Sequence, residues 1–258
     1  MPRVSVILPT FNRASTLPRA VRSVLEQSFE DLELIVIDDG SSDGSADRLP
    51  MDDRRLVLLR QNNLGVAAAR NAGIKKARGE LISFIYSDDE WMPYQLELAC
   101  GFFAAFPGED LFHTEILVRR ENGAASIFPR DEFAFWYPRF ARRIGSKLLD
   151  LPAGEQDVFM RVYGSRCGLE WLKGEIAHKI QPDRPQLYRG AVYPHLRWGY
   201  LAGLQALVIT KRAGHTAGGF NTRLRSAEDF AYMATLFRAF PLNFLSVTGC
   251  IKHEESPE

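Results

Sequence analysis

Short apolar runs alternate with helix-like patterns over the first hundred residues, and this alternation constrains the fold more than any other feature of the sequence. The four apolar runs have the length of β-strands and cover residues 4–8, 32–37, 55–59 and 81–86. Residues 14–28 and 65–79 carry apolar side chains at helical spacing. Strands that are apolar on both faces and are joined by helices predict an α/β fold, with a mostly parallel central sheet and helices on both faces.

Composition and charge place few further limits on function. The chain of 258 residues has 32 Lys plus Arg and 32 Asp plus Glu, so it carries no net charge and we expect no nucleic-acid partner. Three cysteines without a CxxC spacing fit a reducing compartment. The N-terminus lacks the pattern of a signal peptide, and no apolar run reaches the ~18 residues needed to cross a bilayer. We therefore expect a cytoplasmic protein.

Polar residues gather where three of the predicted strands end. These stretches read "PTFNR" at 9–13, "DDGS" at 38–41 and "YSDDE" at 86–90. Because the carboxyl ends of parallel strands open on one edge of the sheet, we expect the three stretches to form one crevice. Arg70, on the helix before the fourth strand, is expected beside it. Acids, an aromatic ring and cations in one crevice suit a nucleotide that carries phosphates and a metal ion.

Two adjacent acids, Asp88 and Asp89, need a physical explanation. Neighbouring carboxylates raise each other's pKa, so the pair is unfavourable in a cleft unless a cation lies beside it. In a regular strand the two side chains would point to opposite faces, so both serve one site only if the chain turns there. Pro93 marks such a turn. One acid can then ligate a hard cation, Mg²⁺ or Mn²⁺, while the other holds a ribose hydroxyl or the turn.

Five segments follow one another in a fixed order. They read "VSVILPTFNR", "QSFEDLELIVIDDGSSDGS", "NLGVAAARNAGIKKARGELISF", "SDDEWMP" and "GGFNTRLRSAEDF". Together they resemble the family two inverting glycosyltransferases of GT-A fold, densely over residues 3–98 and again over 205–238. The resemblance implies one Rossmann-like domain over residues 1–258, with a nucleotide-sugar-binding half at 1–105 and an acceptor-binding half at 106–258.

The resemblance gives roles to residues of the crevice. The predicted nucleotide-binding residues are Pro9, Thr10, Phe11, Asn12, Arg13, Asp38, Asp39, Arg70 and Asp88. Among them, Asp39 is expected to accept the N3–H of the base and Asp88 to hold the ribose. Asp89 is the expected ligand of Mn²⁺ or Mg²⁺ on the diphosphate, with His253 as a second candidate ligand. Tyr86 departs from the family pattern, because many members carry an aspartate there.

Asp229 is the general base that the same resemblance implies. It stands in "SAEDFAYMATLF", which is predicted to begin a helix. Acids in the first turn of a helix also interact favourably with the helix dipole whatever the function, so Glu228 is expected to be an ordinary first-turn acid. Ser226 is the expected helix cap.

The predicted enzyme is a metal-dependent inverting glycosyltransferase. It moves a sugar from a nucleotide-diphosphate donor, UDP-linked by the resemblance, to a saccharide or lipid-linked acceptor in the synthesis of bacterial cell-surface polysaccharide or glycoconjugate. One alternative, a sugar-nucleotide nucleotidyltransferase, needs a glycine-rich loop after the first strand, and "PTFNRAST" has no glycine. The other is a degenerate, non-catalytic nucleotide-binding protein or a receiver-like phosphoacceptor built on Asp38 and Asp39, although no later strand ends in the lysine of a receiver.

Residues 131–151 interleave aromatic and basic side chains. Such a segment can lie on the inner face of an anionic membrane as a peripheral contact, or clamp an acceptor. A core-facing helix with a solvated basic side is the commoner arrangement, so membrane contact is the weaker prediction. Residues 187–200 are a further candidate for an acceptor loop.

Overall fold

The structure is a computed structural model that describes residues 1–129, 158–180, 185–198 and 201–254. The basic aromatic segment 131–151 lies outside these residues, so its contact with a membrane stays a prediction. Within the described ranges, no helix combines the length and the apolar character that a bilayer crossing requires.

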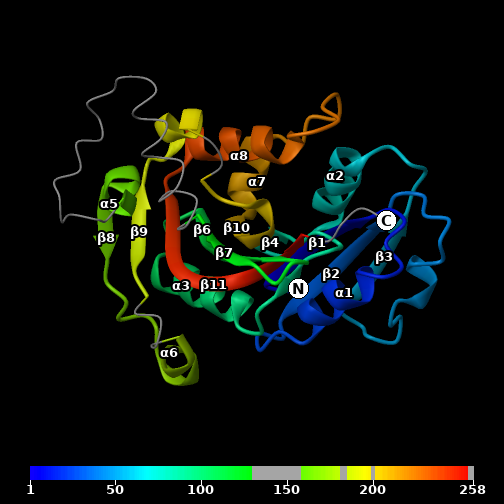
Figure 1. Ribbon diagram of the computed structural model, residues 1–258, viewed down its shortest axis with the longest axis horizontal. Coiled ribbons are helices and arrows are strands. Elements are labelled where there is room, and N and C mark those ends of the chain that lie inside the picture. The colour runs from blue at the N-terminus through cyan, green and yellow to red at the C-terminus, as the bar shows by residue number, and fades with distance from the viewer. Residues whose placement is uncertain (130–157, 181–184, 199–200, 255–258) are drawn as a thin grey trace.

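Eleven strands of the described residues form one sheet through the middle of the molecule (Figure 1). Nine of them follow the order β3-β2-β1-β4-β10-β6-β11-β9-β8, while β5 pairs with β11 and β7 with β6. The strands are β1 (Val4–Thr10), β2 (Leu32–Asp38), β3 (Leu56–Arg60), β4 (Leu81–Phe84), β5 (Glu90–Trp91), β6 (Leu111–Arg120), β7 (Ala125–Phe128), β8 (Ser165–Cys167), β9 (Leu187–Gly190), β10 (Leu207–Thr210) and β11 (Leu242–Glu254).

The strands β3, β2, β1 and β4 form the parallel sheet that the apolar runs predict. Val4 of β1 lies beside Leu32 of β2 and Leu81 of β4, so the three strands begin together. Their carboxyl ends therefore open on one edge, as expected. The fourth strand ends at Phe84 rather than at 86, because the N–H of Asp89 donates to the carbonyl of Tyr86 at 3.2 Å and this turn takes the chain out of the sheet.

Strands from the second half of the chain complete the sheet in mixed orientation. β10 is antiparallel between β4 and β6, and β11 runs parallel to β6. β5, which directly follows the Asp88–Asp89 turn, pairs antiparallel with Cys250 and Ile251 of β11. The turn that carries the acidic pair is thereby held against the last strand, a contact that the apolar pattern does not predict.

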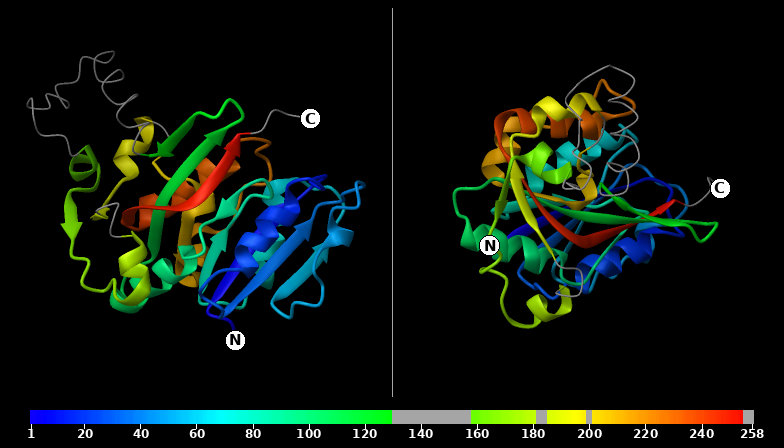
Figure 2. Two further views of the ribbon diagram at one scale, coloured as in Figure 1. Left: turned by 60° about the horizontal axis from the view of Figure 1, so that its bottom comes forward. Right: turned by 60° about the vertical axis from the view of Figure 1, so that its left-hand side comes forward.

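Helices cover both faces of the sheet, as predicted (Figures 1 and 2). They are α1 (Leu17–Leu25), α2 (Val66–Lys76), α3 (Gln95–Ala105), α5 (Val158–Tyr163), α6 (Gly174–Ile180), α7 (Lys211–Ala217), α8 (Glu228–Ala239) and the 3₁₀ turns η1 (Ala46–Arg48), η4 (Tyr193–Trp198) and η5 (Leu204–Ala206). α1 and α3 pack on one face of the sheet, against Val4 and Val6 of β1. α2, α7 and α8 pack on the other face, where Ile7 of β1 points.

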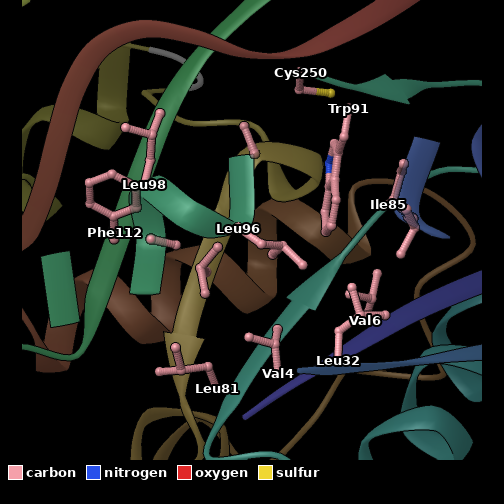
Figure 3. Close-up of a cluster of buried hydrophobic side chains, with 14 of the residues drawn as sticks. Val4, Val6, Leu32, Leu81, Ile85, Trp91, Leu96, Leu98, Phe112 and Cys250 are labelled. Atoms are coloured by element: carbon pink, nitrogen blue, oxygen red, sulfur yellow. The ribbon is translucent and has the colours of Figure 1, made fainter. Parts of the chain in front are cut away.

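The core below α1 and α3 also anchors β5. Figure 3 shows Trp91 of β5 among Val6, Ile85 and Leu96, near Cys250 of β11. The Trp91 ring is 2% exposed, and its Nε1 donates to the carbonyl of Gln205 at 2.7 Å. A buried indole with a satisfied N–H is a strong anchor, so the position of β5 and of the preceding turn is set by the core.

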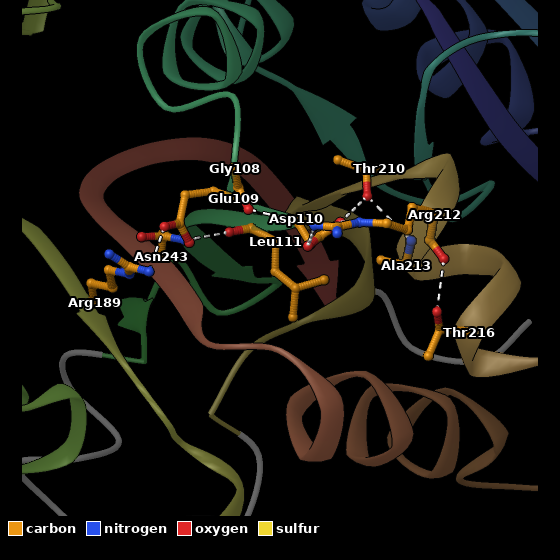
Figure 4. A network of polar contacts seen from close by, with 10 residues as sticks. All are labelled: Gly108, Glu109, Asp110, Leu111, Arg189, Thr210, Arg212, Ala213, Thr216 and Asn243. Atoms are coloured by element: carbon orange, nitrogen blue, oxygen red, sulfur yellow. Dashed lines mark hydrogen bonds and ion pairs between the residues drawn. The ribbon is translucent and has the colours of Figure 1, made fainter.

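Polar contacts fix the start of β6 from two sides (Figure 4). On one side Asp110 accepts from Thr210 and from Arg212 of α7. On the other side Asn243 of β11 donates to Glu109 and to the carbonyl of Leu111, both at 3.0 Å. These contacts fix the alignment of β10, β6 and β11 at the start of β6.

The close packing of α2 on the sheet gives a prediction about stability. A Cβ at Gly73 would lie 2.6 Å from Ile7 and 2.9 Å from Ile37, both fully buried. Overpacking of this kind costs about 1–3 kcal/mol, more than the helix propensity that alanine adds. We expect Gly73→Ala to lower the free energy of unfolding in urea by this amount. Gly108→Ala, where no atom lies within 4 Å of the new Cβ, should leave it unchanged or slightly raised.

Candidate active site

Side chains of the loops after β1 and β2 fasten the rim of the crevice. The N–H of Asn12 donates to Ser41 Oγ, and Asn12 Oδ1 accepts the N–H of Ser42, both at 2.9 Å. The N–H of Ala14 donates to Asp43 at 2.8 Å. Asn12 has a φ of 51°, a left-handed conformation that asparagine tolerates better than most residues. Asn12 therefore shapes this loop, and its contact with a nucleotide stays a prediction.

The end of β1 brings an aromatic ring and a cation to the same rim. Pro9 and Thr10 are buried within the strand, where Thr10 lies beside Asp38. Phe11, the first residue beyond the strand, is 43% exposed, and Arg13 is exposed. An exposed aromatic face at the end of a buried strand is suited to stacking on a base.

Asp39 is a buried acid that ties the loop before α2 to the end of β2. Its Oδ1 accepts from Gln61 Nε2 at 2.7 Å and from the N–H of Leu64 at 2.9 Å, and its Oδ2 accepts from the N–H of Gly65 at 2.8 Å. A carboxylate oxygen accepts two hydrogen bonds, so Oδ2 retains capacity for one more donor, such as a base N–H. Recognition of the base by Asp39 stays a prediction.

The acidic pair lies in the turn between β4 and β5. Arg19 of α1 donates to the carbonyl of Asp88 at 2.7 Å and so fixes the turn. Asp88 is partly exposed, whereas Asp89 is 1% exposed, and burial together with the charge of Asp88 raises the pKa of Asp89 to about 8. Among the described residues, Asp89 Oδ2 is buried without a hydrogen-bond partner. A buried carboxylate oxygen of this kind fits a ligand of a hard cation.

His253 of β11 lies beside this turn. Its ring Nε2 lies 3.2 Å from Glu90 Oε2. In the part of the chain that the structure describes, no group of three or more His, Cys, Asp or Glu side chains is placed to hold a metal ion. A cation at Asp89 would take its other ligands from bound phosphate, as Mg²⁺ commonly does. Ligation by His253 stays a prediction.

The first turn of α8 is held by a buried ion pair rather than by a helix cap. Arg70 Nη1 of α2 donates to Glu228 Oε1 at 2.6 Å, and both side chains are buried. The expected cap at Ser226 is wrong, because the residue before the helix is Ala227, which has a left-handed φ of 57° and makes no side-chain cap bond. The expectation that Glu228 is an ordinary first-turn acid is therefore wrong, because its side chain forms a buried ion pair with Arg70.

Asp229, the second residue of α8, faces a pocket of about 310 Å³. The hydroxyl of Tyr86 donates to Asp229 Oδ2 at 2.8 Å. The pocket has an apolar wall of Ile116, Val118 and Phe128 and a charged wall of Arg120, Lys252 and Glu254. Glu254 accepts from Arg120 at 3.0 Å and from Lys252 at 3.1 Å. The pocket thus offers a partly exposed carboxylate within reach of a bound hydroxyl.

The structure brings most of the predicted residues to one edge, but it adds a role that the sequence analysis missed. Arg70 is 3% exposed and is engaged by Glu228, so its contact with a nucleotide stays a prediction. One signal was available: Arg70 follows three alanines in "AAARNAG", where small neighbours indicate a closely packed helix face. Nothing local in the sequence points to Glu228 as its partner.

Comparisons with known proteins agree with the resemblance. The family profile described as "Glycosyl transferase family 2" matches residues 5–159. A putative teichuronic acid biosynthesis glycosyltransferase, TuaG of Bacillus subtilis, is 36% identical over 122 residues, which are 43% of this chain and 48% of that protein. The GalNAc(5)-diNAcBac-PP-undecaprenol beta-1,3-glucosyltransferase of Campylobacter jejuni is 44% identical over 95 residues, 35% of this chain and 31% of that protein.

The solved structures show the fold. The crystal structure of S. aureus TarS in complex with UDP-GlcNAc superposes with a TM-score of 0.61 at 19% identity, over 100% of this chain and 60% of that chain. This similarity identifies the GT-A fold. The chain spans less than half the length of the two curated relatives, and less than two thirds of TarS.

The buried ion pair gives the second prediction. Removing one partner leaves a buried charge uncompensated, which costs about 3–5 kcal/mol. We expect Glu228→Gln to lower the free energy of unfolding in urea by this amount. The matched control is Glu80→Gln, since Glu80 pairs with Arg3 at an exposed site where such a bridge contributes about 1 kcal/mol or less. If both substitutions lower the free energy of unfolding by the same amount, the buried pair of Arg70 and Glu228 contributes no more to stability than an exposed pair.

Proposed function

The chain belongs to glycosyl transferase family 2, and from this premise we propose that it transfers a sugar from a nucleotide-diphosphate donor to an acceptor hydroxyl, with inversion at the sugar carbon. One juxtaposition carries the proposal. The turn of Asp88 and Asp89 and the carboxylate of Asp229 come from distant parts of the chain, and Tyr86 joins them by a hydrogen bond of 2.8 Å. The proposed diphosphate site and the proposed base would therefore lie next to each other, as a single displacement requires.

The donor nucleotide is proposed to bind in the crevice. Phe11 offers an exposed ring for the base, Asp39 retains one acceptor position, and Asp88 is partly exposed for the ribose. UDP is the proposed nucleotide, by the resemblance and because the structurally similar TarS was solved with UDP-GlcNAc.

Asp89 is proposed to hold Mn²⁺ or Mg²⁺ together with the diphosphate. The support is its buried Oδ2, which has no hydrogen-bond partner among the described residues. Burial and the charge of Asp88 raise the pKa of Asp89 to about 8, so a negative charge on this carboxylate is uncompensated unless a cation binds. A bound divalent ion would stabilise the charge of the departing diphosphate. Arg19 donates to the carbonyl of Asp88 and so holds the turn in place for this role.

Asp229 is proposed to accept the proton of the acceptor hydroxyl. As the hydroxyl oxygen bonds to the sugar carbon, the bond from that carbon to the diphosphate breaks and the proton passes to the carboxylate. The pocket in front of Asp229 is the proposed acceptor site. A saccharide or lipid-linked acceptor in cell-surface polysaccharide or glycoconjugate synthesis is proposed by analogy, since TuaG is named for teichuronic acid synthesis and the Campylobacter relative for an undecaprenol-linked substrate.

The third prediction tests the base. Asp229→Asn keeps the shape and removes the basicity, so we expect transfer to fall by about 10²- to 10⁴-fold while UDP binding by calorimetry stays near normal. Sugar transfer is measured with a panel of nucleotide sugars and candidate acceptors. The matched control is Asp52→Asn, an exposed residue before β3 and so at the opposite end of the strands. Transfer at the wild-type rate by the Asp229 variant would place the base elsewhere.

The fourth prediction tests the metal site. Asp89→Asn replaces a charged ligand by a neutral amide, which is a poorer ligand for a hard cation. We expect the affinity for UDP in the presence of Mn²⁺ to fall to the value measured with EDTA, with loss of turnover. Calorimetry with and without Mn²⁺ measures both states, and an unchanged Mn²⁺ dependence would remove Asp89 from the site. Folding is checked by the thermal unfolding of each variant.

A further inference from the structure

We infer that Tyr86 is a positioning residue for Asp229, and that it holds the base carboxylate from the loop that carries Asp88 and Asp89. The inference rests on the proposed function, because it assumes that Asp229 is the base. It also gives a role to Tyr86, which stands where many members of the family carry an aspartate. At this position the chain has a hydrogen-bond donor in place of a carboxylate.

The contact itself has the geometry of a strong hydrogen bond. The Tyr86 hydroxyl lies 2.8 Å from Asp229 Oδ2, and the other oxygen, Oδ1, accepts the N–H of Phe230. The phenolic O–H donates this hydrogen bond and the carboxylate oxygen accepts it. Each carboxylate oxygen accepts two hydrogen bonds, so both retain a position for an acceptor hydroxyl.

The ring of Tyr86 is fixed by the group that also fixes Glu228. The guanidinium of Arg70 lies 5.1 Å from the centre of the Tyr86 ring and 5.2 Å from that of Phe220. Cation–π contacts of this length are favourable, and more so when the cation is buried. Arg70 therefore binds Glu228 directly and also packs on the ring of Tyr86, whose hydroxyl binds Asp229. Two consecutive residues of α8 thus depend on Arg70.

The first turn of α8 has no side-chain cap, so contacts from other elements contribute to its orientation. The preceding residues 221–227 are all exposed, and Ala227 adopts a left-handed φ of 57° without a side-chain cap bond. Left-handed backbone is unfavourable for a residue with a Cβ, and it persists only where the surroundings determine it. The contacts from Arg70 and Tyr86 belong to those surroundings, and without the phenol Asp229 keeps the hydrogen bond from the N–H of Phe230.

Tyr86 contacts both the proposed base, Asp229, through its side chain and the proposed metal ligand, Asp89, through its backbone. The carbonyl of Tyr86 accepts the N–H of Asp89, so the two residues form the ends of one turn. An aspartate at 86 would bring a second negative charge towards Asp229, and like charges at this distance repel. A tyrosine spans the distance to α8 and donates instead. The base and the acidic pair are thereby held in one rigid arrangement.

The test separates positioning from a structural role by the step that it affects. In Tyr86→Phe the ring stays beneath Arg70 and only the hydroxyl is lost, so we expect kcat for UDP-sugar turnover to fall by about tenfold to a hundredfold, the effect of a hydrogen bond to a charged group. KM for the donor and the Kd of UDP with Mn²⁺ should stay unchanged. In the Asp229→Asn background the same substitution should have no further effect on kcat. A full additional loss there would show that Tyr86 acts elsewhere and overturn the inference.

Tyr232→Phe is the matched control. Tyr232 lies on α8, the helix that carries Asp229, and its ring stacks on Phe220 with 4.1 Å between the ring centres. Its buried hydroxyl has no hydrogen-bond partner among the described residues. We expect this variant to keep the wild-type kcat. If Tyr86→Phe also keeps it, or lowers the affinity for UDP instead, Tyr86 does not position the base.

A second measurement tests the contact without turnover. A double-mutant cycle of Tyr86→Phe and Asp229→Ala on urea unfolding should give a coupling free energy that differs from zero, since each substitution removes the one hydrogen bond that the two side chains share. A zero coupling overturns the inference even if the enzyme is active. Absence of turnover by the wild-type chain with every nucleotide sugar and acceptor would contradict the proposed function, and the cycle would still report on the contact.

Discussion

The site depends on a buried ion pair between two helices that are far apart in the sequence. Arg70 of α2 and Glu228 of α8 meet at 2.6 Å, both almost fully buried. Two charges removed from water lose several kcal/mol of hydration each, and their attraction offsets this loss only when the geometry is good. A displaced α8 would leave both charges unpaired, so the pair fixes the position of α8 more sharply than apolar packing could. Asp229 follows Glu228 directly, so the same constraint sets its place.

Burial of Asp89 is the second constraint. Unlike the paired charges of Arg70 and Glu228, this buried carboxylate lies next to a like charge, that of Asp88. The core that anchors Trp91, together with the pairing of β5 and β11, draws the turn of Asp88 and Asp89 into the protein. The carboxylate of Asp89 loses hydration there, which is why its pKa is raised. A cation supplied with the donor would restore the lost interaction. In the proposed function, the burial of Asp89 is thus unfavourable alone and would be compensated when a diphosphate and its metal ion bind.

Local patterns predicted the parallel part of the sheet, its helices and the edge where ligands gather. β1 to β4 could be predicted because their apolar runs are bounded by turn-forming residues, and the crevice followed from the parallel order. The contacts that complete the site could not, because they join residues far apart: Tyr86 and Asp229 are 143 positions apart, Arg70 and Glu228 158. The insertion of β10 between β4 and β6 has no local signal either. The wrong cap at Ser226 has the same origin, since a propensity for capping was outweighed by a tertiary contact that the sequence did not reveal.

The hydrogen bond from Tyr86 to Asp229 joins two residues that are 143 positions apart, one inside and one beyond the segment that the family profile matches. The family match covers residues 5–159 and so includes Tyr86, the acidic pair and the loops of the crevice. Asp229, Lys252 and Glu254 lie beyond it, on α8 and β11. A donor site can be kept among many enzymes while the acceptor pocket changes, provided that the base stays aligned with the bond to be broken. By the inference drawn above, this alignment would be carried by the phenol of Tyr86, which lies inside the matched segment, whereas Asp229 lies beyond it. Because Tyr86 stands three residues before Asp89, the proposed base would be oriented from the loop of the proposed metal ligand and not from the side chains that line the pocket.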